Sequence, residues 1–526
     1  DDEAQDPLRQ MMAGRMGGRE DPFRRYEVNV IVDHSRTEGA PVVAESDPTY
    51  RNLIGMLERE ARMGTLVTDF TMIRAGSVLE ANGGFLILDM IDLLITPLAW
   101  ESLKRVLQDG TVRIQDPMES YGFIGTHGLR PEPVKIRLKA IIIGSRPLYN
   151  LLYVVDEDFQ KLFKVKADFG TVIKKEASHG LQYARFITKV CQQEGLRHFD
   201  KEAVAGLMEH FSRLVSDQNR LSLQFAEVAD VIRESSYWAS KDGNGQVNRS
   251  HVDKAIAEKR YRSNLVEERL QDMIDEDVLL IQTEGEAVGQ INALSIYSVG
   301  DYSFARPTRV TAQVSPGTQG VVNIEREAKL SGNIHDKGVL ILSGFLHGKY
   351  GSRKPLSLYA SIGFEQSYAG VDGDSASSTE LYAILSSLTQ IPLKQSLAVT
   401  GSINQKGMVQ PIGGVNEKIE GFFETCSARG LTGEQGVIIP KQNVQNLMLR
   451  TDVLDAVREG KFHVYAIESI DEGIELLTGR PAGDLQEDGS YPEGTVHFQA
   501  QQRIEEMSKV VEIRQLTQVH DKGEES

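Results

Sequence analysis

The sequence Val371-Asp372-Gly373-Asp374-Ser375-Ala376-Ser377-Ser378 places one serine in a turn of small and acidic residues, directly before a helix-like run at 378–388. Downstream, Pro411-Ile412-Gly413-Gly414-Val415-Asn416-Glu417-Lys418 places a lysine one turn inside a second predicted helix, 416–429. A serine hydroxyl needs a base within hydrogen-bond reach to act as a nucleophile, and a neutral lysine can be that base. The two stretches therefore predict a serine–lysine pair and point to a peptide hydrolase.

The lysine can act as a base only when its amine is neutral. Burial away from water and from carboxylates must therefore lower its pKa by several units. Thr400, in Ala398-Val399-Thr400-Gly401, is a third hydroxyl that can orient the amine. Backbone N–H groups of the serine turn and of the next helix can hold an oxyanion. For an isolated serine and lysine, the alternative is a helix cap at Asp374 or Ser375 and a lysine that faces solvent.

Three motifs, at 371–378, 399–402 and 410–418, resemble those of Lon proteases in order and spacing. Acid-Gly-Asp-Ser-Ala-Ser is similar to the B-type branch and its C-type relatives. Over about residues 266–480 the resemblance implies Ser375 as nucleophile, Lys418 as general base and Thr400 as helper, with Asp374 gating the site or orienting the lysine. It implies a serine-type endopeptidase of the endopeptidase La class. Such an enzyme degrades unfolded or damaged proteins in protein quality control and needs no cofactor for peptide hydrolysis.

The front half contains a second informative stretch, Gly83-Gly84-Phe85-Leu86-Ile87-Leu88-Asp89. It resembles the second nucleotide motif of AAA+ proteins, an apolar strand that ends in an acid. In that family the aspartate helps to hold Mg²⁺ and a following glutamate positions water. Asp89 is therefore a candidate cofactor-binding residue, but Met90 stands where the glutamate is expected. Ser145, after the predicted strand 141–143, takes the place of a polar sensor.

Other parts of a nucleotide site are missing from the sequence. Arg220 is the nearest candidate for the second sensor, and the region of the arginine finger offers only Lys161, Lys164 and Lys166. No Gly-x-x-x-x-Gly-Lys-Ser/Thr loop occurs. These departures favour a degenerate AAA-like scaffold, as in C-type Lon-like proteases, and peptide hydrolysis without ATP. An ATP-driven Lon protease whose phosphate loop precedes Asp1 is the alternative, so ATP and Mg²⁺ stay open. A non-enzymatic Lon-domain scaffold is a third possibility.

The segment 68–74 places Phe70, Met72 and Ile73 ahead of Gly76. These apolar side chains are expected either to line the entrance of a channel or to form a buried strand connection. The resemblance implies a homo-oligomeric ring, expected to be a hexamer, over a proteolytic chamber that receives unfolded protein substrates.

Composition sets broader limits. The 526 residues are too many for a single core, and the net charge of −17 argues against nucleic acid as the main partner. Cys191 and Cys426 are typical of buried thiols in a reducing compartment, and no metal site is expected. No uncharged apolar run approaches the ~18 residues of a membrane span, and no signal peptide is visible. We therefore expect a cytoplasmic protein, although the sequence begins without methionine.

Periodicity predicts a multidomain α/β, α and α+β chain. The expected parts are an AAA+-like α/β subdomain at 1–180, truncated or degenerate, a lid-like helical subdomain at 181–265, the Lon proteolytic domain at 266–480, and a polar tail at 481–526. In the first part we expect a parallel sheet, with strands at 28–32, 85–89 and 139–144 and helices at 52–62 and 100–108. In the third we expect strands at 288–296, 308–314, 320–324, 339–342, 356–363, 397–403, 436–440 and 462–466. The tail is expected to be peripheral, with one helix at 499–515.

Overall fold

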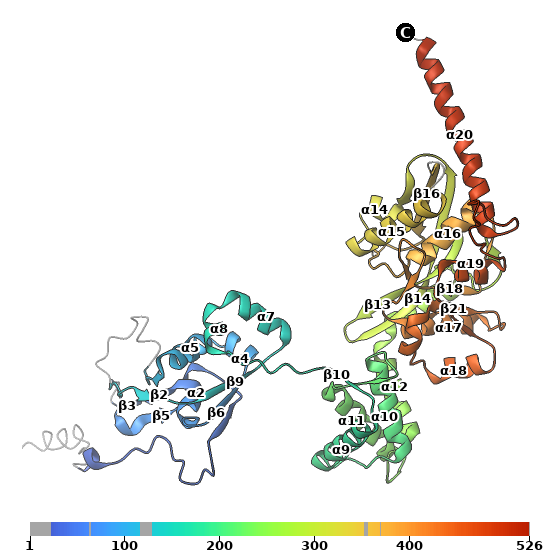
Figure 1. The fold of residues 1–526 in the computed structure, drawn as a ribbon. Helices are drawn as coiled ribbons and strands as arrows, with labels where there is room; N and C mark the ends of the chain where they lie inside the picture. The colour runs from blue at the N-terminus through green and yellow to red at the C-terminus, as the bar shows by residue number, and fades with distance from the viewer. Residues whose placement is uncertain (1–22, 63–64, 116–128, 352–355, 369, 525–526) are drawn as a thin grey trace, which may run out of the picture. The chain divides into compact units, whose positions relative to one another are not determined.

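The computed structural model describes residues 23–62, 65–115, 129–351, 356–368 and 370–524 (Figure 1). They belong to two compact units, residues 1–168 and 169–526. Each unit has its own hydrophobic core. The first 22 residues of the predicted first part lie outside the described residues. The four-part division stays a prediction.

The first unit is built on a three-stranded parallel sheet. Strands β1 (Val42–Glu45), β6 (Phe85–Asp89) and β9 (Lys139–Ile143) lie in the order β1-β6-β9. The predicted strands at 85–89 and 139–144 and the parallel arrangement are confirmed, as is the helix predicted at 100–108. The helices of the unit are α2 (Tyr50–Ile54), α3 (Ser77–Glu80), α4 (Met90–Ile95), α5 (Ala99–Asp109), α7 (Arg146–Val155) and α8 (Glu157–Leu162).

Two expectations for this unit are wrong. Residues 28–32 form no strand. Val28 and Val30 are exposed, so these apolar side chains do not pack against the sheet. The helix expected at 52–62 ends at Ile54, because the chain then forms β2 (Gly55–Leu57), which pairs antiparallel with β5 (Ile73–Ala75). The remaining short pairs are β3 (Glu60–Arg62) with β4 (Thr65–Val67), and β7 (Thr111–Val112) with β8 (Val134–Lys135).

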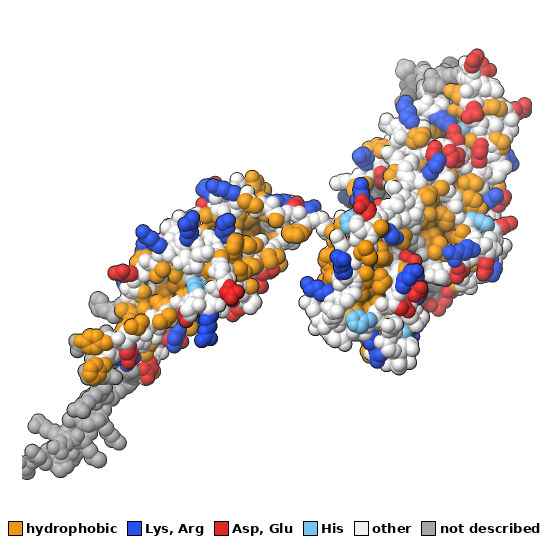
Figure 2. Space-filling model, turned by 60° about the horizontal axis from the view of Figure 1, so that its bottom comes forward, with side chains coloured by type: hydrophobic (Ala, Val, Ile, Leu, Met, Phe, Trp, Pro, Cys, Tyr) orange, Lys and Arg blue, Asp and Glu red, His pale blue; other side chains and the backbone are white. Residues whose placement is uncertain are grey.

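The face drawn in Figure 2 carries both apolar and charged side chains. Lysine and arginine are interspersed with aspartate and glutamate on the face in view. Exposed apolar side chains of the first unit include Ile91, Ile95, Ile143 and Val154. Among the described residues, no helix is both long and apolar enough to cross a membrane.

The second unit begins with a helical part (residues 169–275). It contains α9 (Ala177–Glu194), α10 (Lys201–Leu214), α11 (Phe225–Lys241), α12 (Arg249–Ser263) and α13 (Leu265–Asp275), with the antiparallel pair β10 (Val172–Lys174) and β11 (Arg220–Ser222). The first four helices share a core that includes Ile187, Leu207, Phe211 and Ile232. Cys191 is buried there, as expected.

The rest of the second unit is a sheet part (residues 276–524). Its mixed seven-stranded sheet has the order β15-β16-β14-β13-β18-β21-β22. The strands are β13 (Gln290–Val299), β14 (Tyr302–Pro316), β15 (Gly320–Asn323), β16 (Leu358–Phe364), β18 (Leu397–Val399), β21 (Gly436–Pro440) and β22 (His463–Ile467). Shorter pairs join β12 (Glu286–Ala287) to β17 (Leu393–Lys394) and β19 (Ser402–Ile403) to β20 (Val409–Gln410).

Helices pack against this sheet and around the site described below. They are α14 (Ile324–Glu327), α15 (Asn333–Tyr350), α16 (Ser377–Thr389), α17 (Val415–Arg429), α18 (Thr451–Arg458), α19 (Ile470–Thr478) and α20 (Val496–Glu524), with the short 3₁₀ helix η3 (Lys441–Asn446). α16 is buried along its whole length, because β13, β14, α15 and α20 all contact it.

Three expectations for the sheet part need correction. Residues 339–342 belong to helix α15, whose buried Val339, Leu342 and Leu346 recur at helical spacing. The strand expected at 397–403 is two strands, separated by Thr400 and Gly401. The tail is not peripheral, and its helix is longer than expected: Val496, Ala500, Ile504 and Met507 of α20 lie in the main core.

The crossing of α17 over β14 depends on Gly421. A Cβ atom at this position would lie 1.9 Å from the carbonyl oxygen of Ala305. Because backbone cannot yield as a flexible side chain can, we expect Gly421→Ala to lower the free energy of unfolding by about 2 kcal/mol or more. Gly348 of α15 is the matched control, since a Cβ there meets no atom within 4 Å. Gly348→Ala should stabilise by up to about 1 kcal/mol. Urea unfolding compares the two, and equal stabilities would contradict the close contact.

Candidate functional site

Ser375 lies in the nucleophile loop (residues 370–376), the part of the connection from β16 to α16 that directly precedes α16. The Asp372 carboxylate holds this loop, because it accepts the N–H of Gly373 at 2.8 Å and those of Ile334 and His335 at 3.2 and 3.3 Å. The Ser375 carbonyl accepts the Gly401 N–H at 2.8 Å. The loop is thus attached both to the start of α15 and to the end of β18, which fixes the position of the half-buried Ser375.

Lys418 lies in the first turn of α17. The helix begins after Gly414, whose φ of 66° is in the left-handed region that favours glycine. A Cβ at this position would also lie 2.1 Å from Ile296 Cδ1. Glycine at position 414 therefore allows the chain to enter α17 through a tight turn. Lys418 is 2% exposed, so its stem crosses the interior to reach the nucleophile loop.

The Lys418 amine lies between two hydroxyls. Its Nζ is 2.9 Å from Ser375 Oγ and 2.9 Å from Thr400 Oγ1. Thr400 Oγ1 in turn donates to the Ser375 carbonyl oxygen at 3.3 Å. With its proton used in this way, the threonine hydroxyl accepts an N–H from the lysine. The lone pair of a neutral amine is then free to face the serine hydroxyl.

Burial lowers the pKa of Lys418 to about 8, and the negative charge of Asp374 raises this pKa in part. No carboxylate of the described residues forms an ion pair with Lys418. The Asp374 side chain thus acts on the amine through its charge, while the Asp374 carbonyl accepts the Ser377 N–H at 3.1 Å. A pKa near 8 leaves a substantial neutral fraction at mildly alkaline pH, as a lysine base requires.

The turn around Ser375 also presents backbone donors. Within the described part of the chain, no hydrogen bond has the N–H of Asp374, Ser375 or Ala376 as its donor. Unpaired N–H groups just before a helix are suited to a developing negative charge. These groups are the candidates for the expected oxyanion site.

Two nucleotide-site candidates of the first unit, Asp89 and Ser145, act as helix caps in the structure. Asp89 ends β6 and caps α4, because its carboxylate accepts the N–H of Ile91 at 2.7 Å and of Asp92 at 3.4 Å. Ser145 caps α7 by accepting the Leu148 N–H at 3.4 Å. The structural alternative for Asp89, an acid that caps the next element, is therefore present in the structure.

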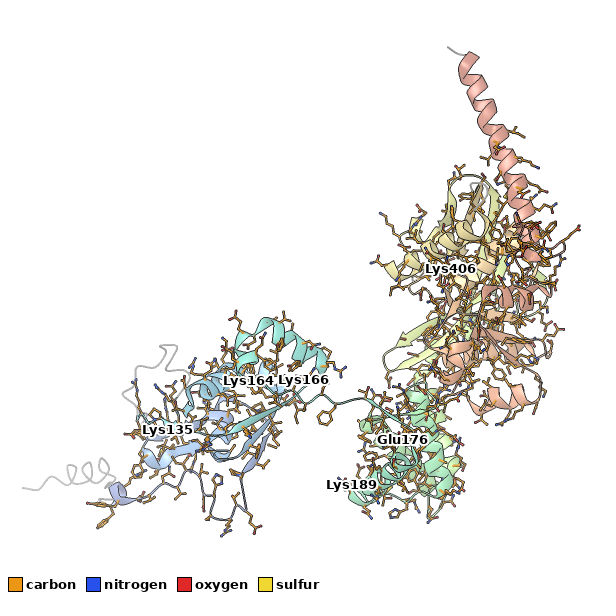
Figure 3. The ribbon with its side chains drawn as sticks, viewed as in Figure 1. Lys135, Lys164, Lys166, Glu176, Lys189 and Lys406 are labelled. Atoms are coloured by element: carbon orange, nitrogen blue, oxygen red, sulfur yellow. The ribbon has the colours of Figure 1, made fainter. Side chains whose placement is uncertain are left out.

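The four basic candidates are exposed, and three of them form ion pairs with nearby acids. Lys161 pairs with Asp158 at 3.3 Å, and Lys166 pairs with Asp168 at 3.1 Å. Lys164 and Lys166 lie near each other on the segment that follows α8 (Figure 3). Arg220, in the second unit, pairs with Asp217 at 3.3 Å. None of these contacts involves Asp89.

The three candidate channel residues lie on a 3₁₀ turn and the strand after it. Phe70 and Met72 belong to η2 (Phe70–Met72) and are half-buried, and Ile73 begins β5. Ile73 packs against the core of the first unit, which accounts for its apolar character. Their role in a channel stays a prediction.

Sequence reasoning missed the residues that hold the nucleophile loop in place. Asp372 and Gly401 lie within the motifs at 371–378 and 399–402, but the sequence alone did not predict that they bond to the backbone around Ser375. An acid three residues before a serine, with a glycine after it, is a signal for a carboxylate that accepts backbone N–H groups in a turn. Ser377 adds a further contact, since its Oγ accepts the Ile403 N–H at 3.1 Å.

Three models of known protein families match separate parts of the chain. Residues 38–170 match the model of the LonB-like AAA domain, residues 198–262 that of the archaeal LonB AAA+ ATPase lid domain, and residues 366–479 that of the Lon protease (S16) C-terminal proteolytic domain. The site described above lies within the last of these ranges, apart from the contacts that α15 makes with its loop.

Longer alignments with individual proteins show the same similarity. A putative Lon protease homologue of Escherichia coli K12 is 34% identical over 412 residues, which cover 77% of this chain and 68% of the relative. Another, from Haemophilus influenzae, is 33% identical and covers 82% and 70%. An archaeal Lon protease of Archaeoglobus fulgidus is 29% identical and covers 77% and 62%.

Proposed function

Because the chain belongs to the Lon protease family, we propose that it is an endopeptidase in which Ser375 is the nucleophile and Lys418 the general base. The observation that carries the proposal is the pair of 2.9 Å distances from Lys418 Nζ to the hydroxyls of Ser375 and Thr400. The proposed substrates are unfolded or damaged proteins, since a backbone-directed nucleophile among small side chains needs an extended chain. A hexameric ring that encloses the site is supported by family membership.

The proposed reaction uses these groups in a fixed order. Ser375 Oγ attacks the peptide carbonyl carbon, and its proton passes to Lys418 Nζ. The N–H groups near Ser375 hold the oxyanion of the tetrahedral intermediate. Lys418 then gives the proton to the leaving amine, and an acyl-enzyme remains. Lys418 next removes a proton from the water that releases the acid product and restores Ser375. Thr400 keeps the amine oriented throughout.

The AAA-like part is proposed to support this reaction without ATP hydrolysis. Asp89 already accepts two backbone N–H groups, and Met90 occupies the place of a water-positioning acid. The described residues therefore do not fit a complete ATP-hydrolysing site. The alternative is ATP-driven proteolysis. It is favoured by the match of residues 198–262 to the lid domain of an ATPase.

A comparison of casein cleavage with and without Mg-ATP tests this proposal. We expect the rate of cleavage of fluorescently labelled casein to change by less than about twofold, because the described residues of the AAA-like part lack the water-positioning acid that ATP hydrolysis needs. A Ser375→Ala protein supplies the blank for contaminating proteases. Stimulation of tenfold or more by Mg-ATP would select the ATP-driven alternative.

A further inference from the structure

The helix that carries Lys418 also carries two acids on another face, a buried Glu420 and a half-buried Glu424. Glu420 lies two residues after Lys418 and Glu424 four residues further on. Successive helical residues are ~100° apart, so Glu420 points away from the direction of Lys418. Glu420 is 6% exposed. A buried carboxylate is costly unless it is paired, so its partner matters for the position of α17.

That partner belongs to the helical part. Arg213, near the end of α10, donates two hydrogen bonds to the two carboxylate oxygens of Glu420, at 2.6 and 2.7 Å. It also donates to the Met448 carbonyl oxygen at 2.6 Å. The fork geometry fixes both the distance and the orientation of the carboxylate. Among the ion pairs of the described residues, Arg213 is the only charged side chain bonded to Glu420.

The turn after α10 contacts a second element that also holds α17. The Asn446 side-chain amide donates to the Ser216 carbonyl at 2.7 Å, and the Gln218 N–H donates to the Gln445 carbonyl at 3.0 Å. The Gln218 amide reaches the carbonyls of Val444 and Leu447. The helical part is therefore bonded along residues 444–448 as well as at Glu420.

This same segment holds the start of α17. The Asn416 side chain donates to the Asn446 carbonyl at 2.9 Å and accepts the Met448 N–H at 2.7 Å. Asn443 exchanges two hydrogen bonds of 2.9 Å with the backbone of Ile412. Lys418 thus lies between Asn416 and Glu420, and both residues are attached, directly or through one segment, to the turn at the end of α10.

We propose that Arg213 is a positioning residue for Lys418. Through Glu420 and Met448 it sets the placement of α17, so the amine is held within reach of Ser375. A displacement of about 1 Å between reacting groups can lower a rate by about a hundredfold. Any movement of the helical part relative to the sheet part is transmitted to the base through this contact. The inference rests on the peptidase function proposed above.

A neighbouring contact is less suited to this role. Glu424 also bonds to the helical part through Arg260, but Arg306 and Arg450 of the sheet part pair with the same carboxylate. Loss of Arg260 leaves Glu424 paired, whereas loss of Arg213 leaves Glu420 without its cation. We therefore expect the position of α17 to depend more on Arg213 than on Arg260.

The test compares kcat and KM of full-length variants with labelled casein. Arg213→Met should lower kcat about tenfold or more and leave KM within about twofold, because substrate contacts are unchanged. Arg213→Lys keeps the positive charge but cannot form both guanidinium hydrogen bonds, so its kcat should lie between those of the wild type and Arg213→Met. Arg233 is the matched control: it forms a two-bond pair with Glu194 within the helical part. Arg233→Met should retain kcat.

The possible outcomes separate this inference from the proposed function. Unchanged kcat in a folded Arg213→Met protein, or a rise in KM alone, would overturn the positioning role. If that variant is unfolded at the assay temperature, Arg213→Lys decides, and a wild-type kcat in it would overturn the role equally. Absence of casein cleavage by the wild-type protein, with the ring and fold intact, would count against the peptidase itself.

Discussion

Ser375→Ala is expected to reduce casein cleavage by about a thousandfold or more while the protein stays folded. The only hydrogen bond of the Ser375 hydroxyl among the described residues is the one to Lys418 at 2.9 Å. Removal of this oxygen takes away the atom that would form the acyl-enzyme, and no other group can replace it. The side chain is half-buried, so its loss should change the melting temperature little. Labelled casein measures the activity, and thermal unfolding measures the fold.

Ser378 provides a matched control three residues further along. Its Oγ is fully buried and has no hydrogen-bond partner among the described residues. Ser378→Ala removes an unsatisfied polar atom from the start of α16, so activity should remain near that of the wild type and stability should be equal or slightly higher. Equal activity of Ser375→Ala and Ser378→Ala would remove Ser375 from the proposed mechanism.

The local part of the site could be predicted from sequence. A turn of small residues followed by a helix placed Ser375 before α16, and the predicted helix at 416–429 placed Lys418 near the start of α17. The meeting of the two side chains could not be predicted by periodicity, because 43 residues separate them. The resemblance of three motifs to those of Lon proteases supplied that expectation, and in the structure the Lys418 amine lies between the hydroxyls of Ser375 and Thr400.

Several predictions of strands failed because a short apolar run does not show which other segment of the chain it packs against or pairs with. Residues 339–342 look like a strand when read alone, but the apolar spacing continues to Leu346 with a helical period. The alternation at 28–32 is that of a strand, yet no neighbouring strand pairs with it. Secondary structure in such segments depends on tertiary contacts that lie outside the window of residues being read.

The contact between Arg213 and Glu420 also could not be predicted from the sequence. Glu420 and Glu424 on a predicted helix are typical of a solvent-facing row. Both carboxylates are instead paired with arginines, and the partner of Glu420 lies 207 residues away in sequence. The burial of Glu420 can be recognised only once the position of α10, the helix that carries Arg213, is known.

Lys418→Met is expected to lower casein cleavage by about a hundredfold to a thousandfold, nearly as much as Ser375→Ala. Methionine keeps an apolar chain of similar length but has no amine to accept the serine proton. Loss of a general base typically removes a factor of ~10²–10⁴. Thr400→Val should have a smaller effect, about tenfold, because it removes only the hydroxyl that orients the amine. A larger loss for Thr400→Val than for Lys418→Met would reverse these roles.

The pH profile of the wild type gives an independent test of the base. Since burial lowers the pKa of Lys418 to about 8, about a tenth of the molecules carry the neutral amine at pH 7 and about half at pH 8. Activity should therefore rise with pH and level off above about pH 9. The residual activity of Lys418→Met should lack this rise. A flat wild-type profile between pH 6 and 9 would contradict a lysine base.

The same burial should make Lys418→Met more stable than the wild type at neutral pH. The folded pKa of about 8 lies below the usual 10.5, so the unfolded chain binds an extra proton between these values. The free energy of unfolding of the wild type is then reduced by about 3 kcal/mol below pH 8, and this penalty disappears as pH rises to about 10.5.

Methionine at position 418 carries no such penalty but loses two hydrogen bonds, each contributing ~1 kcal/mol. We therefore expect Lys418→Met to unfold at a higher temperature than the wild type at pH 7 and at a lower one near pH 10. If Lys418→Met proved less stable at both pH values yet still active, Lys418 would be a structural residue rather than a base.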